Sequence, residues 1–185
     1  MRQIVLASGS PRRMRLLQEA GFSVERCVSN APEIEDAGLA PEALAMENAR
    51  LKWAAVAGAH GGKLVLAADT VVWLDGKFYA KPADMADAER MLGELAGRTH
   101  RVVTGVALGI GGGEPRSFFD GTLVTFRELG VVEIREYLGS IDPLDKAGGY
   151  AAQDGGERII ASFEGSMSNV VGLPMEALAA YLRQE

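Results

Sequence analysis

The segment from Ser8 to Arg13 combines residue types that bind phosphate: two hydroxyls, a glycine and two adjacent arginines. Arginine pairs with phosphate oxygens through parallel hydrogen bonds, and glycine lets backbone N–H groups approach an anion closely. The alternative is an ordinary capped helix whose arginines are solvated. Spacing alone does not separate these two interpretations.

A helix that begins at this segment would hold cations where its own dipole disfavours them. Ser10 suits an N-cap and Pro11 suits the first helical position, so Arg12 and Arg13 fall in the first turn. A cation there costs roughly 0.3–1 kcal/mol unless an anion lies between it and the helix end. We therefore expect Ser8, Ser10 and the two arginines to hold an anion such as a polyphosphate.

A single acid interrupts the apolar run of residues 63–74. Asp69 follows five apolar residues, and residues 71–74 are apolar again. We expect the strand to break at Asp69 and Thr70, which places the acid at a strand end, where open α/β sheets bind ligands. A turn former or a salt-bridge partner is the alternative. Because a buried, unpaired carboxylate is costly, Asp69 requires a cation, a metal or hydrogen-bond donors.

Three lysines beside other helix or loop signals are candidate partners for this acid: Lys52, Lys81 and Lys146. Each alone is equally consistent with a solvated surface residue. Lys146 differs because two glycines and Tyr150 follow it, which permits close backbone approach and gives a ligand an aromatic ring to pack against.

Two acids of the polar loop at residues 30–38, Glu33 and Glu35, offer hard oxygen ligands. Together with Asp69 they could hold Mg²⁺ or Mn²⁺. Zinc chemistry is disfavoured because His60 and His100 have no second histidine or cysteine at zinc-like spacing. The glycines at residues 109–113 join two strand patterns, so they indicate a turn rather than a dinucleotide-binding loop.

The composition is that of a globular protein: 185 residues, 48% hydrophobic and 24% charged. A formal net charge of −6 argues against a partner that is a nucleic-acid polymer. Cys27 is the one cysteine, so no internal disulfide forms and a reducing cytoplasm is expected. No apolar run approaches the ~20 residues of a membrane span, and the first run is too short for a signal peptide.

The elements that must position these residues alternate between strand and helix patterns, with hairpins and crossovers mixed, so we expect a mixed α/β fold. Strands are expected at residues 4–7, 22–29, 63–74, 77–80, 99–110, 116–126 and 158–163, with the pair 99–110 and 116–126 antiparallel. Helices are expected at residues 11–20, 41–57, 84–96, 130–138 and 174–182, and a glycine-rich loop at 142–156.

Six motifs occur in one order along nearly the whole chain. They are Ser8-Gly9-Ser10-Pro11-Arg12-Arg13, Ala68-Asp69-Thr70-Val71-Val72, Lys81-Pro82, Gly97-Arg98-Thr99-His100-Arg101-Val102-Val103-Thr104-Gly105, Asp145-Lys146-Ala147-Gly148-Gly149-Tyr150 and Asn169-Val170-Val171-Gly172-Leu173-Pro174. In this order they make the chain resemble the Maf-like nucleotide pyrophosphatases, whose fold is akin to that of the inosine triphosphate pyrophosphatases. Any one motif is weak evidence, whereas six in order are specific.

The resemblance implies a strongly twisted mixed sheet flanked by helices, with a nucleotide cleft between two lobes and residues 1–185 as a single domain. It implies hydrolysis of a nucleoside triphosphate between the α- and β-phosphates, which requires a divalent metal cation. Asp69 matches the family's proposed proton acceptor, Glu33 matches a position that lines its polar pocket, and Glu33 with Asp69 is the expected metal site. The substrate-binding positions expected from the resemblance and from the reasoning above are Ser8, Ser10, Arg12, Arg13, Lys52, Lys81, Lys146 and Tyr150.

Base choice in the family differs at three positions, which correspond here to Arg12, Thr70 and Gln153. This combination resembles the branch that acts on dTTP and UTP, with modified pyrimidine triphosphates as further substrates. The branch that prefers 7-methyl-GTP carries an aromatic residue at the position of Arg12. Gln153 offers a donor and an acceptor, as the edge of uracil or thymine requires. The chain departs from the family in Ala152, where isoleucine is usual, and in a flexible Gly148-Gly149 pair.

Two other functions stay open at this point. One is a 7-methyl-GTP pyrophosphatase of the same family, and the other is a non-catalytic, nucleotide-binding regulator of septum formation. A regulator that only binds nucleotide does not need a proton acceptor such as Asp69, which favours a house-cleaning enzyme of nucleotide metabolism. The expected partner is a small-molecule nucleoside triphosphate, and a homodimer is the family expectation.

Overall fold

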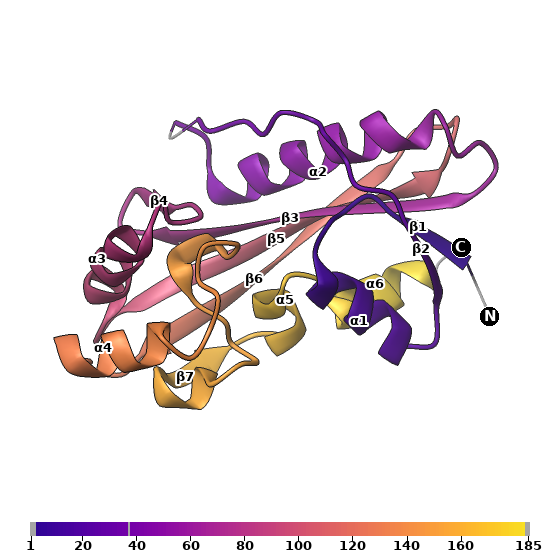
Figure 1. The fold of residues 1–185 in the computed structure, drawn as a ribbon. Coiled ribbons are helices and arrows are strands. Elements are labelled where there is room, and N and C mark those ends of the chain that lie inside the picture. The colour runs from indigo at the N-terminus through magenta and orange to yellow at the C-terminus, as the bar shows by residue number, and fades with distance from the viewer. Residues whose placement is uncertain (1–2, 37, 184–185) are drawn as a thin grey trace.

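The computed structural model describes residues 3–36 and 38–183, which form a seven-stranded mixed sheet with helices on both faces (Figure 1). The strand order is β2-β1-β3-β5-β6-β7, and β4 also pairs with β3. The strands are β1 (Gln3–Leu6), β2 (Ser23–Arg26), β3 (Leu64–Leu74), β4 (Lys77–Tyr79), β5 (Thr99–Ile110), β6 (Arg116–Phe126) and β7 (Ile160–Glu164). The helices are α1 (Pro11–Glu19), α2 (Pro41–Ala57), α3 (Met85–Leu95), α4 (Val131–Leu138), α5 (Met167–Val171) and α6 (Met175–Leu182).

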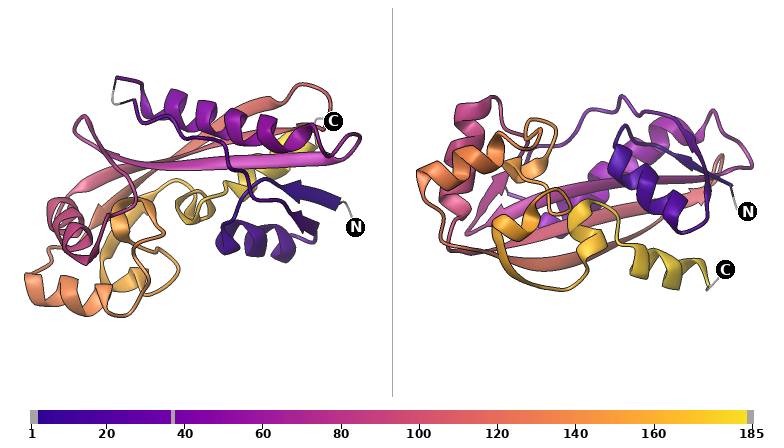
Figure 2. Two further views of the ribbon diagram at one scale, coloured as in Figure 1. Left: turned by 45° about the horizontal axis from the view of Figure 1, so that its top comes forward. Right: turned by 60° about the horizontal axis from the view of Figure 1, so that its bottom comes forward.

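Side chains on β3 alternate between two faces of the sheet, and each face buries its own apolar cluster. Val65 and Ala67 pack under α2, whereas Leu64, Leu66 and Ala68 pack toward α1 and α6. A third cluster lies at the far end of the sheet, where Val72 and Leu74 meet α3 and α4. Figure 2 shows α2 on one face and α1, α5 and α6 on the other.

The edge of β3 that faces β1 and β4 is open at residues 67–71. β5 pairs with β3 from Leu64 to Trp73, which occupies the opposite edge of β3 over almost its full length. On the free edge, β1 pairs with Leu64–Leu66 and β4 pairs only from Val72 onward. A short notch therefore lies between these two strands, and Asp69 and Thr70 stand in it.

Helix α2 approaches the sheet closely because β5 carries a glycine beneath it. Gly105 pairs with Asp69 in the strand register, and a Cβ atom at Gly105 would overlap the backbone of Ala45 and Met46 in α2. This contact sets the distance from α2 to Asp69. Even α2, whose 17 residues make it the longest helix in the described part of the chain, does not have the length and apolar content to cross a membrane.

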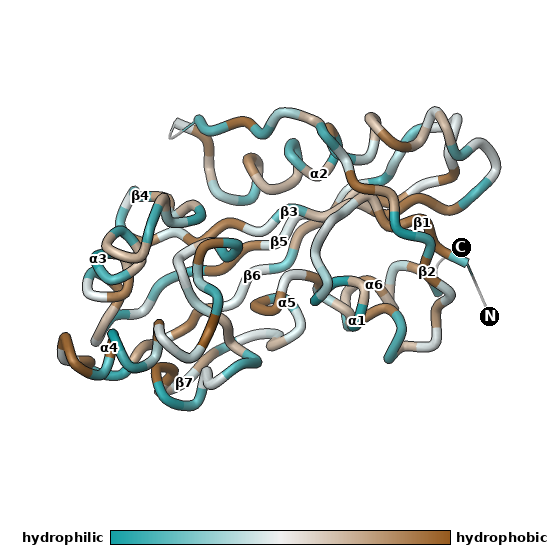
Figure 3. Tube along the Cα trace, viewed as in Figure 1, coloured by the Kyte–Doolittle hydropathy of each residue, from teal (hydrophilic) through white to brown (hydrophobic). Residues whose placement is uncertain are grey.

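The structure confirms most expected elements and corrects three. The strand does not break at Asp69 and Thr70: β3 is continuous, because the backbone there pairs with β5 throughout, so Asp69 lies in mid-strand rather than at a strand end. Figure 3 shows hydrophobic stretches along β3 with a more hydrophilic segment between them. The strand expected at 158–163 begins later, at Ile160, because residues 156–158 form a 3₁₀ turn. The short helix α5 was not expected from the sequence.

We predict that Gly105→Ala destabilises the fold by about 1–3 kcal/mol, since the added methyl forces α2 away from the sheet. The free energy of unfolding in urea measures this. Gly93→Ala is the matched control: Gly93 is exposed in α3 with open space around it, so alanine should stabilise the helix by about 0.5–1 kcal/mol. A Gly105→Ala variant as stable as the parent protein would contradict the proposed close contact.

Candidate functional site

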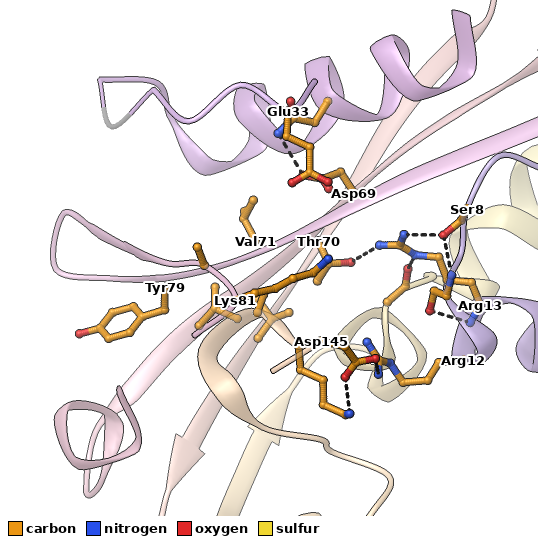
Figure 4. Close-up of a pocket in the computed structure, with 18 of the residues that line it drawn as sticks. Ser8, Arg12, Arg13, Glu33, Asp69, Thr70, Val71, Tyr79, Lys81 and Asp145 are labelled. Carbon is orange, nitrogen blue, oxygen red and sulfur yellow. Dashed lines mark hydrogen bonds and ion pairs between the residues drawn. The ribbon is translucent and has the colours of Figure 1, made fainter. Parts of the chain in front are cut away.

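A cavity of about 780 Å³ opens at the notch in β3. Its walls come from the start of α1, residues 28–35, α2, the open edge of β3, the end of β4, residues 145–152 and the end of α5. Figure 4 shows Asp69 and Glu33 on one side of β3, and Thr70 with Arg13 on the other. Because the edge is open, side chains from both faces of the sheet reach the same space.

The start of α1 forms as expected, with its capping groups turned toward this cavity. The Ser10 hydroxyl accepts a hydrogen bond from the backbone N–H of Arg13 (3.4 Å), and Pro11 opens the helix. The Ser8 hydroxyl accepts from the backbone N–H of Ser10 (3.2 Å). Both arginines therefore lie in the first turn, as the sequence predicts, and both line the cavity.

Arg13 is held by neutral acceptors only. Its Nε donates to the Gly172 carbonyl (2.7 Å), Nη1 to the Ser8 hydroxyl (3.2 Å) and Nη2 to the Thr70 hydroxyl (3.0 Å). Burial lowers the pKa of the guanidinium, and the charge of Asp69 offsets part of this effect. Arg13 forms no ion pair with any carboxylate among the described residues, and one N–H on each terminal nitrogen is still unused. This is a desolvated cation that an anionic ligand would stabilise.

On the opposite face of β3, Lys52 joins two carboxylates. Its Nζ lies 2.5 Å from Asp69 Oδ1 and 2.7 Å from Glu33 Oε1. Asn48, one turn before Lys52 on α2, donates to Asp69 Oδ2 (3.3 Å) and also bonds both backbone groups of Ile34. Burial raises the pKa of Glu33, but the hydrogen bond and charge of Lys52 outweigh it and bring this pKa below its ordinary value. Of the three lysine candidates, Lys52 is the partner of Asp69.

The carboxylates of Glu33 and Asp69 converge on one point, which the Lys52 ammonium occupies. No group of three or more His, Cys, Asp or Glu side chains within residues 3–36 and 38–183 is arranged to hold a metal ion. Mg²⁺ in phosphoryl-transfer sites uses one or two carboxylates and completes its shell with substrate phosphates and water. The two carboxylates fit that role when a phosphorylated substrate supplies the remaining oxygens.

Asp145 connects the start of α1 to the glycine-rich loop through two ion pairs. Asp145 lies 3.3 Å from Arg12 Nη1 and 2.5 Å from Lys146 Nζ, and Lys146 also donates to the Asp142 carbonyl. Burial raises the pKa of Asp145, but the hydrogen bond from Lys146 and the charges of both cations lower it below its ordinary value overall. The bridge contributes one net positive charge to the cavity wall.

Tyr150 lines the cavity with its ring while its hydroxyl points into the core. The hydroxyl lies 2.8 Å from Nε2 of the buried His100, and both rings pack edge-on against Phe126. Burial lowers the pKa of His100 to about 4, so the imidazole is neutral near pH 7. The hydrogen bond with His100 therefore fixes the position of the Tyr150 ring.

The cavity brings together nearly all of the site residues expected from the sequence. Its lining includes Ser8, Ser10, Arg12, Arg13, Glu33, Lys52, Asp69, Thr70, Lys81, Lys146 and Tyr150, and also Glu35. Lys81 is exposed and forms no ion pair with any residue that the structure describes, so its charge faces the cavity. Gln153 is exposed in the loop and is not part of the lining, whereas its neighbours Ala151 and Ala152 are.

Two residues of this site were not singled out from the sequence. Asn48 is a buried polar residue on the apolar side of α2, four positions before Lys52, and that spacing was an available signal. Asp145 stands directly before Lys146 in the sequence, but its pairing with Arg12 spans 133 positions and no local pattern announces it.

The chain is similar in sequence and in fold to several known proteins. The family described as Maf-like protein matches residues 3–185. A dTTP/UTP pyrophosphatase of Bacillus anthracis is 42% identical over 184 residues, which is 100% of this chain and 96% of the relative. One from Akkermansia muciniphila is 42% identical over 172 residues, covering 93% of this chain and 90% of that protein. The solved Ham1 protein of Staphylococcus aureus superposes with a TM-score of 0.56 at 16% identity over 99% of both chains, which confirms the expected fold.

We predict that His100 makes stability fall between pH 6.5 and about pH 4. The unfolded chain binds a proton near pH 6.5, whereas the folded chain binds it only near pH 4. The unfolded state therefore holds more protons in this window, and acidification favours it by up to about 3 kcal/mol. Unfolding free energies in urea from pH 7 to pH 4 should fall less steeply for His100→Gln, which does not titrate. Parallel curves for the two proteins would contradict this prediction.

Proposed function

The chain belongs to the Maf-like protein family, and from this premise we propose that it hydrolyses dTTP and UTP to the monophosphate and pyrophosphate. The 42% identity over the full chain to proteins named dTTP/UTP pyrophosphatase supports this substrate choice. The observation that carries the proposal is that half-buried Arg13, with no carboxylate partner among the described residues, faces the same cavity as the Asp69 carboxylate. Such a site attracts a polyanion and places beside it a carboxylate that can accept a proton from water.

The cationic side chains hold the triphosphate. Arg13 provides two unused N–H donors in a fixed fork, and the start of α1 adds backbone N–H groups and its dipole. Lys81 and the Arg12–Asp145–Lys146 bridge contribute further positive charge to the cavity wall. These groups offset the charge that builds up on the pyrophosphate as it leaves.

Asp69 accepts a proton from the attacking water. The water oxygen forms a bond to the α-phosphorus, the bond from that phosphorus to the α,β-bridging oxygen breaks, and pyrophosphate departs with the electron pair. Lys52 and Asn48 fix the orientation of the Asp69 carboxylate. The proton that Asp69 has accepted from the water passes to solvent after the reaction. No covalent intermediate with the protein is needed.

Glu33 and Asp69 would hold a divalent cation, Mg²⁺ or Mn²⁺, together with the substrate phosphates. Such a cation supplies charge neutralisation of the phosphates and makes a water more acidic. Lys52 then balances the charge of the two carboxylates when no substrate is present.

We further propose that residues 1–185 act as a single domain, because the long strands β3 and β5 run through all three apolar clusters. The lone Cys27 is consistent with a reducing cytoplasm. The homodimer stays a prediction, which the mass measured by light scattering tests directly.

A nucleotide panel tests the proposed function. Purified protein with Mg²⁺ or Mn²⁺ should release pyrophosphate from dTTP and UTP with higher kcat/KM than from 7-methyl-GTP, ATP or GTP. A higher kcat/KM for 7-methyl-GTP would move the chain to the other branch of the family. No release from any triphosphate would reject the activity.

Asp69→Asn should lower kcat by roughly 10²–10⁴-fold, the contribution typical of a general base, with a much smaller change in KM. Pyrophosphate release under saturating dTTP measures this. Glu47→Gln is the control, since Glu47 is exposed on the same helix as Lys52 and lies outside the cavity lining. A kcat within threefold of the parent protein for Asp69→Asn would exclude Asp69 as proton acceptor.

A further inference from the structure

Thr104 lies behind the cavity wall, out of reach of a ligand. It is fully buried on β5, directly opposite Thr70 in the strand register, and it is not part of the cavity lining. Its hydroxyl lies 2.9 Å from the Thr70 hydroxyl and 3.1 Å from the Asn169 carbonyl oxygen. A chain of hydrogen bonds therefore runs from Arg13 through two threonines to α5.

The direction of each hydrogen bond in this chain follows from counting protons. A backbone carbonyl oxygen can only accept a hydrogen bond, so the single hydroxyl proton of Thr104 points to the backbone carbonyl oxygen of Asn169. The Thr70 hydroxyl must then donate to Thr104, and this turns a lone pair of Thr70 toward Arg13 Nη2, which donates to it at 3.0 Å. Thr70 has no proton left for a ligand.

Asn169 is anchored on the side away from the cavity. Its side-chain amide donates to the Val102 carbonyl and to the Thr122 hydroxyl, each at 3.0 Å, and its backbone N–H donates to Ser166. Three residues further on, the Gly172 carbonyl accepts from Arg13 Nε at 2.7 Å. Helix α5 thus fixes Arg13 twice, once directly and once through the threonine pair.

We propose that Thr104 and Asn169 are positioning residues for the phosphate-binding Arg13, and that Thr70 serves this clamp rather than reading the base. This deepens the proposed function and rests on it for the identity of the substrate. This positioning role differs from the base-choice role that the family resemblance suggests for Thr70. A residue that orients Arg13 affects every triphosphate equally, because all of them share the same phosphates.

Binding of inorganic tripolyphosphate to the full chain, measured by calorimetry, tests the network without any base or catalysis. Thr104→Val removes the hydroxyl at nearly constant volume, which frees the Thr70 proton to turn against Arg13. We expect the Kd to rise about five- to tenfold, in the range for the net loss of one typical hydrogen bond. Thr104→Ser keeps the hydroxyl and should stay within twofold. Equal Kd values for Thr104→Val and the parent protein would overturn the proposal.

A double-mutant cycle separates positioning from a general loss of packing. If Thr104 acts through Thr70, Thr104→Val should change the Kd by less than twofold in a Thr70→Val background. Independent, multiplicative effects would overturn the proposal. Should Thr104→Val fail to fold, as judged by its thermal unfolding curve, Thr70→Val alone carries the test through the selectivity measurement that follows.

The ratio of kcat/KM for dTTP to that for GTP decides what Thr70 does. We expect Thr70→Val to lower both values by the same factor, which leaves the ratio within twofold of the parent protein. A ratio that changes fivefold or more would assign Thr70 to base reading and overturn the proposal. Failure of the proposed function appears differently, as no pyrophosphate release by the parent protein, and the tripolyphosphate measurement still reports on the network.

Discussion

The interrupted edge of β3 is the constraint on which the site depends. A strand buried on both faces and paired on both edges would present neither Asp69 nor Thr70 to a ligand. Here β1 ends its pairing at Leu66 and β4 begins at Val72, so the strand stays rigid through β5 while its free edge opens to the cavity. Neighbouring side chains on opposite faces then border one cavity: Asp69 on the α2 face is the proposed proton acceptor, and Thr70 on the other face accepts a hydrogen bond from Arg13.

The charges around this edge are distributed unevenly, and the imbalance has a physical consequence. Lys52 is shared by two carboxylates, and Asp145 is shared by two cations, so each group is largely compensated within the protein. Arg13 is different because its partners within the described residues are a carbonyl and two hydroxyls. Neutral acceptors orient a guanidinium without cancelling its charge. The protein thereby bears the cost of a partly desolvated cation, which the proposed phosphate ligand would relieve on binding.

Local signals in the sequence predicted the elements and most of the site, while long-range pairing set the rest. The Ser10 cap, the prolines at helix starts and the apolar periodicity of α3 act within a few residues, and the structure confirms them. The break expected at Asp69 was wrong because strand continuity is decided by pairing with β5, about 35 positions away, and not by one polar residue. Likewise, the Thr70–Thr104–Asn169 chain joins three separate motifs, and only the folded register reveals that they are one network.

The two ends of the cavity are built differently, and this bears on how specificity can vary. Arg13, Asp69 and Lys52 are mounted on helices and a central strand, where packing and hydrogen bonds fix each side chain. The other wall is a loop in which Gly148 and Gly149 adopt positive φ angles of 73° and 72°, which side chains with a Cβ rarely tolerate. A substitution late in that loop, such as Ala152 where the family usually has isoleucine, reshapes the wall without changing the contacts of Arg13 and Asp69. The geometry therefore lets the choice of base change while the hydrolytic chemistry stays the same.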